Sequence, residues 1–256
     1  MSKSCVGCRD DIALPFDFKM AFQPIVDMAQ GRVWGYEALV RGADGASAFS
    51  VLSKVSDELR YKFDQAARVM AIETAGRLFA GRDLRLSINF MPNAVYEPMA
   101  CIQKSLAAAR RVDFPHRNLM FEFTENERMD DVPHVQRIVE AYRKLGFWTA
   151  LDDFGAGFAG LGLLARLQPD LIKIDMELLR DIHQSRAKQA IIAGVVGIAR
   201  TLDIHVLAEG VENDEELTVL RAAGISLFQG YHFARPALMA LPVVPLLSKQ
   251  TTARAV

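Results

Sequence analysis

Acidic and amide side chains recur along this chain, each at or just beyond the end of a short apolar run. The positions are Glu37, Asn89, Glu122, Glu125, Asp152, Asp153, Asp175, Glu209, Glu212 and Gln229, and Lys173 occupies one more run. Helix N-caps or solvated loops would explain one or two such residues, because Asp and Asn favour those places. The recurrence predicts that these residues converge on one site.

Convergence of so many carboxylates would be costly without a partner. Like charges about 4 Å apart repel by on the order of 4 kcal/mol per pair at an effective dielectric near 20. Either raised pKa values or bound cations can offset this cost, and we favour cations. Carboxylate oxygens with one amide carbonyl suit Mg²⁺ or Mn²⁺ better than zinc. The neighbours Asp152 and Asp153 could supply one carboxylate that bridges two ions and one that serves a single ion, as in phosphoryl displacement.

The elements expected to position these residues are short strands that alternate with longer helices. Strand-like runs occur at 20–26, 33–40, 84–90, 119–123, 148–151, 171–174, 205–208 and 226–228. Eight strands with helices between them predict an α/β fold, a TIM-like (β/α)8 barrel, with its chemistry at the carboxyl ends of the strands. The turn at Gln30 and Gly31 is too short for a parallel crossover, so the first strand should be antiparallel. Gly146 and Gly224 each precede a strand and indicate helix C-caps.

Length and composition exclude several classes of protein. The chain has 256 residues, 51% of them hydrophobic, which is enough for one large core and too apolar for a disordered chain. Thirty basic against 31 acidic side chains argue against a broad nucleic-acid surface, so we expect no DNA or RNA partner. The longest apolar runs, 190–199 and 237–247, fall short of the roughly 18 residues of a membrane span.

We therefore expect one cytoplasmic barrel without membrane insertion. The N-terminus lacks the apolar stretch of a secretory signal, and three cysteines cannot all pair within one chain. No linker interrupts the chain, so the expected organisation is an N-terminal extension at 1–18, a barrel at 19–248 and a C-terminal tail at 249–256.

The order of the motifs resembles that of the EAL-domain cyclic di-GMP phosphodiesterases over residues 22–236. The matching pieces are Gln23-Pro24-Ile25, Glu37-Ala38-Leu39-Val40-Arg41, Ser87-Ile88-Asn89, Glu122-Phe123-Thr124-Glu125, Asp152-Asp153-Phe154-Gly155, Lys173-Ile174-Asp175, Glu209-Gly210-Val211-Glu212 and Gln229-Gly230-Tyr231. Any one tripeptide would be weak evidence, but the whole ordered set is specific.

The resemblance implies hydrolysis of cyclic di-GMP to linear 5'-pGpG with two Mg²⁺ or Mn²⁺ ions, lowering cyclic di-GMP signalling. It implies that one ion is held by Glu37, Asn89, Glu122 and Asp152, and the other by Asp152, Asp153 and Glu209. Lys173 would orient or help deprotonate the attacking water, and Glu209 and Glu125 would also serve catalysis. The substrate contacts implied are Gln23, Arg41, Asp175 and Gln229.

The resemblance also gives Glu125 the role of anchor for the glycine-rich loop at 154–160, which in turn places the metal-binding aspartates. An ordinary strand-to-helix turn is the simpler reading of such a loop, but its position beside the paired aspartates favours the supporting role. In this loop Ala156, Phe158, Ala159 and Gly160 replace the Thr, Tyr, Ser and Ser that are commoner in the family.

Two other functions stay open. A non-catalytic EAL module would bind cyclic di-GMP or a regulatory protein partner, although such relatives usually lose metal ligands and none is lost here. A barrel that uses Mg²⁺ to stabilise an enolate ranks last, because it lacks an evident second base beyond Lys173. The family further implies a homodimer formed by helices beside the loop.

Several marked residues have simple structural explanations. Cys5 and Cys8 form a lone C-x-x-C that could be half a zinc site or a redox pair, whereas Cys101 is expected to be buried. The alternating Phe16, Phe18 and Phe22 predict one buried face of the N-terminal segment, and a partner-binding stripe is the alternative. The histidines show no ligand spacing, although His232, beside Tyr231, could touch substrate.

Overall fold

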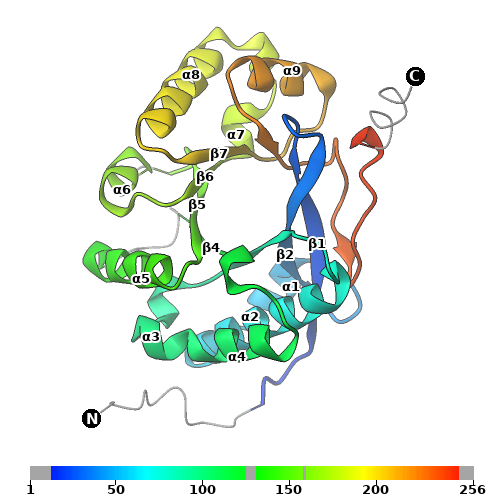
Figure 1. Cartoon of the computed structure of the whole chain (residues 1–256), viewed down its shortest axis with the longest axis vertical. Helices are drawn as coiled ribbons and strands as arrows, with labels where there is room; N and C mark the ends of the chain where they lie inside the picture. The colour runs from blue at the N-terminus through cyan, green and yellow to red at the C-terminus, as the bar shows by residue number, and fades with distance from the viewer. Residues whose placement is uncertain (1–12, 125–130, 158–159, 248–256) are drawn as a thin grey trace.

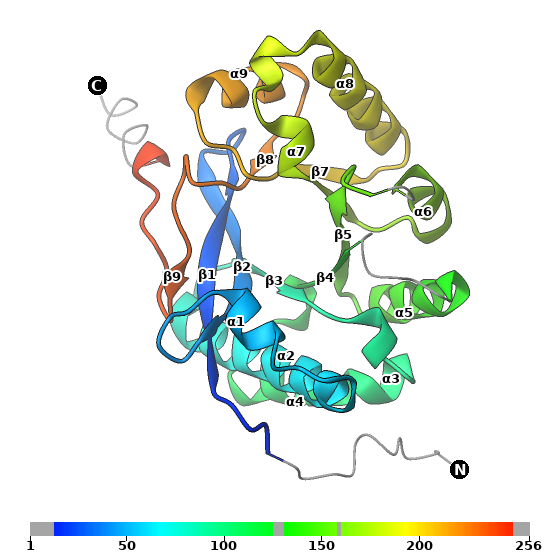
Figure 2. The same ribbon diagram turned by 180° about the vertical axis from the view of Figure 1, so that it is seen from behind.

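Strands and helices alternate along the chain and close into a barrel wrapped by helices (Figure 1, Figure 2). This computed structural model describes residues 13–124, 131–157 and 160–247. The strands are β1 (Phe18–Asp27), β2 (Arg32–Gly42), β3 (Arg85–Asn89), β4 (Leu119–Thr124), β5 (Trp148–Phe154), β6 (Leu171–Ile174), β7 (His205–Ala208), β8 (Leu227–Phe228) and β9 (Ala237–Leu238). The α-helices are α1 (Ala48–Leu52), α2 (Asp57–Phe79), α3 (Pro98–Cys101), α4 (Gln103–Arg111), α5 (Val132–Lys144), α6 (Gly160–Leu167), α7 (Met176–Leu179), α8 (Arg186–Thr201) and α9 (Asp214–Ala222). Single 3₁₀ turns are η2 (Pro92–Ala94), η3 (His116–Asn118) and η4 (Ile182–Gln184).

The strand order confirms the predicted (β/α)8 barrel and its antiparallel first strand. Strands β2 to β8 pair in parallel and in chain order, and β1 closes the barrel between β8 and β2, antiparallel to both. The predicted strand positions agree with the structure to within a few residues. Strand β9 was not predicted; it pairs with β1 at Ala21 and Phe22, on the stretch that the two-residue β8 does not reach.

The barrel interior consists of two layers with different chemistry. Near the amino ends of the parallel strands, an apolar layer comprises Ile25, Trp34, Met120, Ala150, Leu171, Leu207 and Leu227. Side chains on a strand alternate between its two faces, so the residue two positions along points into the interior as well. Those residues are Gln23 on the antiparallel β1, and Glu122, Asp152, Lys173, Glu209 and Gln229 at the carboxyl ends of the parallel strands. The polar layer therefore follows from strand register.

The register of strand pairing shifts at two places, one on β2 and one on β5. On β2, Ile25 pairs with Gly35 and Val26 pairs with Val33, so Trp34 is an extra residue. Because a bulge shifts the alternation by one position, Trp34 and Glu37 both reach the interior although they lie three residues apart. A second irregularity, between Leu151 and Phe154 on β5, falls on the two adjacent aspartates.

The helices cover the outside of the barrel with the apolar core between them and the strands. Phe18 and Phe22 are buried and Phe16 is half-buried, in ring contact with Phe63 on α2, which confirms the predicted buried face. Cys101 is buried with a free thiol, as expected. Cys5 and Cys8 lie outside the described residues.

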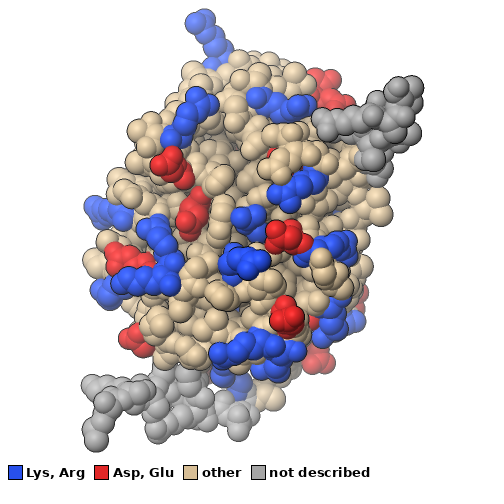
Figure 3. All heavy atoms as spheres, in the orientation of Figure 1, with Lys and Arg blue, Asp and Glu red and all other residues tan. Residues whose placement is uncertain are grey.

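The helix ends agree with the sequence patterns as well. Gly146 and Gly224 have φ of 79° and 96° after α5 and α9, the left-handed conformation of a helix C-cap. In the described part of the chain, no helix is long and apolar enough to cross a membrane. On the face drawn in Figure 3, basic and acidic side chains are interspersed among uncharged ones.

Candidate functional site

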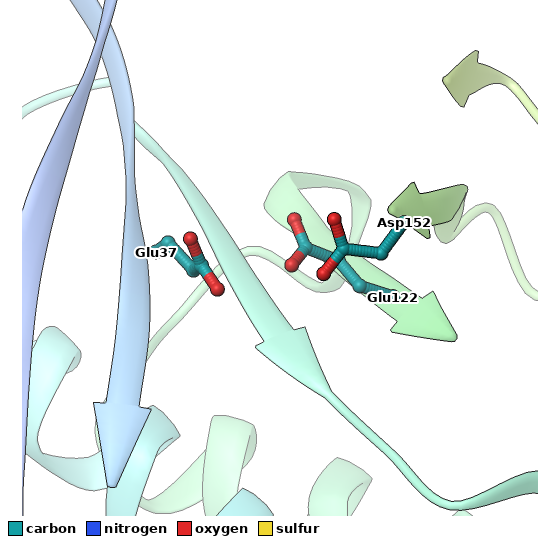
Figure 4. Close-up of side chains that lie close together, drawn as sticks. All are labelled: Glu37, Glu122 and Asp152. Atoms are coloured by element: carbon teal, nitrogen blue, oxygen red, sulfur yellow. The ribbon is translucent and has the colours of Figure 1, made fainter. Parts of the chain in front are cut away.

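Carboxylates from four strands meet at the carboxyl end of the barrel. In Figure 4, Glu37 on β2, Glu122 on β4 and Asp152 on β5 extend toward a shared space. One carboxylate oxygen from each of these residues lies within 4.8 Å of the others. Asp152, Asp153 and Glu209 form a second such group with the same spacing. Asp152 belongs to both groups, so the two triads overlap.

Lys173 lies at the centre of the acidic cluster. Its ammonium group is within 3.5 Å of four carboxylates, with Nζ 2.7 Å from Glu209, 2.9 Å from Glu122, 3.2 Å from Asp152 and 3.5 Å from Glu37. The side chain is 1% exposed, so almost all of this charge is inside the protein. The cluster thus contains five carboxyl groups and one ammonium.

The electrostatic strain in the cluster is visible in the pKa values. Burial raises the pKa of Glu122 to about 8, and repulsion from Glu37 and Asp152 adds to this, while Lys173 opposes it. Burial also raises the pKa of Glu209 well above its usual range. For Lys173, burial acts to lower the pKa, but the surrounding carboxylates prevail and raise it well above its usual range. Lys173 is therefore an ammonium ion in this site.

The β5 irregularity turns both aspartates toward the site. Asp153 has φ of 55°, and its N–H donates to Asp152 Oδ1 at 2.9 Å. In a regular strand two adjacent side chains point to opposite faces, so the distortion is what lets both contribute. Burial, followed by the charge of Asp152, raises the pKa of Asp153. At Gly155, with φ of 99°, an added Cβ would lie 2.2 Å from the Leu178 side chain.

Hydrogen bonds fix the side chains around Glu37 and identify the atoms left to face a ligand. Asn89 donates through Nδ2 to Glu37 Oε1 at 2.9 Å, so its carbonyl oxygen is the atom that could bind a cation. Gln229 Nε2 donates to the other Glu37 oxygen at 2.8 Å, while Gln229 Oε1 is buried and has no hydrogen-bond partner among the described residues.

Two hydroxyl groups that support the carboxylates received no role from the sequence. Ser87 Oγ donates to Glu122 Oε1, and Thr124 Oγ1 donates to Asp153 Oδ2 at 2.9 Å. Ser87 lies two positions before Asn89 on β3, and Thr124 lies two positions after Glu122 on β4. That spacing was a usable signal, because alternate positions share one face.

Two cavities flank the acidic cluster, and Glu37 lines both. The larger, about 660 Å³, includes Asn89, Asp152 and the apolar side chains of Phe63 and Phe90. The smaller has a volume of about 270 Å³ and is lined by Gln23, Glu37, Asp153, Asp175, Met176, Glu209, Gly210, Glu212, Gln229, Gly230 and Tyr231. The site is thus a two-part cleft with negative charge at its middle.

Four residues predicted to bind substrate have different surroundings. Gln23 and Gln229 line the smaller cavity and are buried. Asp175 lines it too, but also caps α7, because its Oδ1 accepts from Glu177 N at 2.7 Å. Arg41 donates to the carbonyl of Val40 at 2.7 Å and is absent from the described residues that line the two cavities.

Part of the predicted loop falls outside the described residues. Glu125, Phe158 and Ala159 are not among the described residues, so the anchoring of the loop by Glu125 stays a prediction. Tyr231 and His232 lie in the described part of the chain. Tyr231 lines the smaller cavity and is 51% exposed, and the guanidinium carbon of Arg235 lies 4.0 Å from the centre of its ring. His232 Nε2 lies 3.2 Å from Asp214 Oδ1, and its contact with substrate stays a prediction.

Residues 12–236 match the family model described as EAL domain. The match covers most of the chain and includes every strand that contributes to the acidic cluster. This chain belongs to the EAL domain family. The resemblance found in the motif order is thereby confirmed.

Solved structures of EAL proteins have the same fold. A standalone versatile EAL protein from Vibrio cholerae O395, in its c-di-GMP bound form, is 51% identical with a TM-score of 0.88, and the match covers 92% of this chain and 99% of that one. Klebsiella pneumoniae BlrP1 in a calcium/cy-diGMP complex is 36% identical with a TM-score of 0.84, covering 95% of this chain and 60% of that one.

Curated relatives differ in what their names state. The blue light- and temperature-regulated antirepressor BluF of Escherichia coli is 35% identical over 88% of this chain and 55% of its own length. A cyclic di-GMP phosphodiesterase of Pseudomonas aeruginosa is 30% identical over 86% of this chain and 38% of its own length. The chain thus spans about half or less of these relatives.

The donor set of this EAL domain fits hard divalent cations. The two triads supply carboxylate oxygens at spacings that one ion can bridge, and the Asn89 carbonyl oxygen lies beside the first. Among these donors there is no His or Cys, which zinc would favour. Raised pKa values in the absence of cations are the expected counterpart of such a site.

Proposed function

We propose that this EAL domain hydrolyses one phosphodiester bond of cyclic di-GMP to give linear 5'-pGpG, with two Mg²⁺ or Mn²⁺ ions as cofactors. The observation that carries the proposal is the pair of overlapping carboxylate triads that share Asp152 between two cavities. A carboxylate shared by two ions is a common arrangement for in-line displacement at phosphorus.

The proposed ligands follow the two triads. Glu37, Asn89, Glu122 and Asp152 would hold one ion, and Asp152, Asp153 and Glu209 would hold the other. Bound cations lower the pKa of a coordinated water and offset the charge that develops on the phosphoryl oxygens. Because the product keeps its phosphate on the 5' oxygen, the water oxygen joins phosphorus while the bond from phosphorus to the 3' oxygen breaks.

Lys173 orients the attacking water by hydrogen-bond donation. Its raised pKa keeps it protonated among the carboxylates, and an ammonium donates without accepting. Glu209, which accepts from Lys173 at 2.7 Å, fixes the lysine's direction as well as serving a cation. Action of Lys173 as a base would require its pKa to fall once cations share the carboxylates.

The two cavities would accommodate the two halves of an extended cyclic dinucleotide. The proposed substrate contacts are Gln23, Asp175 and Gln229 in the smaller cavity, together with Arg41, which follows Val40 of the larger cavity's lining. The c-di-GMP bound form of the Vibrio cholerae protein and the BlrP1 complexes with calcium or manganese and cy-diGMP support this ligand and this cation class for the present chain.

The direct test is turnover by the purified chain. Cyclic di-GMP is incubated with protein and Mn²⁺ or Mg²⁺, and linear pGpG is quantified by chromatography against a sample with excess chelator. We expect product only when cations are present. Absence of product above the chelated control, with the chain folded by circular dichroism, would reject hydrolysis.

A second candidate is a regulatory module that binds without hydrolysis. BluF, at 35% identity, is named an antirepressor, and this name motivates the regulatory candidate. Calorimetry with cyclic di-GMP and Ca²⁺ separates the two functions: binding in Ca²⁺ together with no turnover in Mn²⁺ would favour the regulatory module over the enzyme.

We also propose that the domain forms a homodimer in the cytoplasm. Helix α8 buries Ile192, Val195 and Val196 but leaves Ile191 and Ile198 exposed, at 49% and 39%, on its outer face. Their spacing of seven residues gives two turns of apolar contact for a second copy. Replacing both by Glu should convert a dimer to a monomer in light scattering, and a wild-type chain that is already monomeric would contradict the proposal.

A further inference from the structure

A buried ion pair outside the barrel has no role in the function proposed so far. Asp64 and Arg68, one turn apart on α2, pair with side chains 1% and 0% exposed. Arg68 Nε is buried without a partner in the described structure. Burying two charges costs several kcal/mol per ion before their attraction is counted, and apolar replacements of such pairs are often as stable. Fold stability alone therefore explains the pair poorly.

The pair contacts the segment that carries Asn89. Asp64 uses its second oxygen, Oδ1, to accept the backbone N–H of Met91 at 2.9 Å. Met91 comes two residues after Asn89, and the residue between them, Phe90, donates its N–H to the carbonyl of Glu122 at 2.9 Å. The two backbone N–H groups that follow Asn89 are thus both hydrogen-bonded, that of Phe90 to β4 and that of Met91 to α2.

The ion pair itself is braced by α5. Arg68 Nη1 donates to the Tyr142 hydroxyl at 3.2 Å, and the Tyr142 ring packs against Phe90 with ring centres 5.6 Å apart. Asp64 also lines the same cavity of about 660 Å³ as Asn89 and Asp152. Two outer helices therefore converge on one backbone position beside the candidate site.

We propose that Asp64 is a positioning residue: with its charge balanced by Arg68, it fixes the backbone at Met91 and so aims the Asn89 amide at Glu37 and the first cation. This inference rests on the proposed function, because it assumes a cation at Asn89. A carboxylate acceptor makes a stronger hydrogen bond to a backbone N–H than a neutral oxygen does. Burial raises the pKa of Asp64, and the charge of Arg68 and the Met91 N–H oppose that rise.

The test separates the ion pair from its hydrogen bond to Met91. The double variant Asp64→Leu with Arg68→Met removes both charges and the acceptor, whereas Asp64→Asn with Arg68→Met removes the charges and keeps an acceptor oxygen. Asp170→Leu is the matched control, because Asp170 Oδ2 accepts the Thr149 N–H at 2.8 Å at the opposite end of the barrel. Mn²⁺ affinity is measured by calorimetry on each full chain without substrate.

We expect the Leu/Met variant to bind Mn²⁺ about tenfold more weakly than wild type, the size typical for loss of a supporting contact to a ligand. The Asn/Met variant should recover most of the affinity, and the Asp170→Leu control should lose stability but bind Mn²⁺ normally. With substrate, the Leu/Met variant should show a lower kcat and little change in KM. Equal Mn²⁺ affinity in the Leu/Met variant and wild type would overturn the inference while leaving the proposed function intact.

A measurement on the wild-type chain does not depend on any variant folding. If Asp64 and the cation act on the same segment, Mn²⁺ binding must slow hydrogen exchange at the Met91 amide, because coupling between two sites is reciprocal. Unchanged exchange at Met91 with bound Mn²⁺ would overturn the inference. Failure of the wild-type chain to bind Mn²⁺ at all would instead reject the cation site, and this inference with it.

Discussion

The two ends of the barrel interior are built on the same strands but differ in chemistry: one is apolar and the other carries ionisable groups. At the amino ends, Met120 and Leu171 belong to an apolar layer with nearly complete burial. Two residues further along the same strands, Glu122 and Lys173 are just as buried but ionisable. The apolar layer is stabilised by burial, whereas the charged layer is tolerated for its chemistry. Shape and function are therefore separable along one strand.

The largest effect expected from this separation is on turnover, at Asp152. Asp152→Asn keeps the shape of the side chain but removes the charge shared by both triads. We expect kcat to fall by about a thousandfold or more, since a group that stabilises transition-state charge is lost. The unfolding midpoint in chelator should stay within a few degrees of wild type, because a like charge is removed from a crowded cluster. Turnover within a few fold of wild type would show that Asp152 is not at the reacting centre.

The matching change in the apolar layer is Leu171→Ala, two residues before Lys173 on β6. Leu171 is fully buried, so its truncation should lower the free energy of unfolding by about 2–5 kcal/mol. The folded fraction should retain wild-type kcat and Mn²⁺ affinity, as measured by denaturant titration together with an assay in buffer. A loss of kcat as large as that of Asp152→Asn would mean that the two layers are mechanically coupled.

Most of this comparison could be predicted from the sequence, because the alternation of side chains and the order of the strands fix which residues meet. The bulges at Trp34 and in β5 could not, since they depend on pairing between strands. The supporting group Asp64 was missed for a related reason: its partner, the Met91 amide, lies 27 residues away. Contacts of that kind leave no periodic pattern in a single sequence.

The charged end of the barrel interior should also respond to pH. Glu122, whose pKa burial raises to about 8, and Glu209, whose pKa burial raises well above its usual range, must both be ionised to bind cations, so binding at neutral pH releases at least one proton. Mn²⁺ affinity should therefore rise by at least about tenfold per unit between pH 6 and 8. In the metal-free chain, the free energy of unfolding should fall as the pH rises toward 8. A carboxyl group whose pKa is raised on folding favours the folded state only while it is protonated.

The smallest effect expected tests whether Ser87 tunes this response. Its hydroxyl lowers the pKa of Glu122 by donating to the carboxylate, so Ser87→Ala should move the rise in Mn²⁺ affinity to higher pH and weaken Mn²⁺ binding at pH 7 by up to about tenfold. Thr149→Val is the control, because the Thr149 hydroxyl donates to Asp170 at 2.9 Å at the apolar end. If both variants shifted the pH profile equally, the effect would come from general loosening of the barrel. A shift confined to Ser87→Ala would show that the charged layer has its own local support, independent of the layer beneath it.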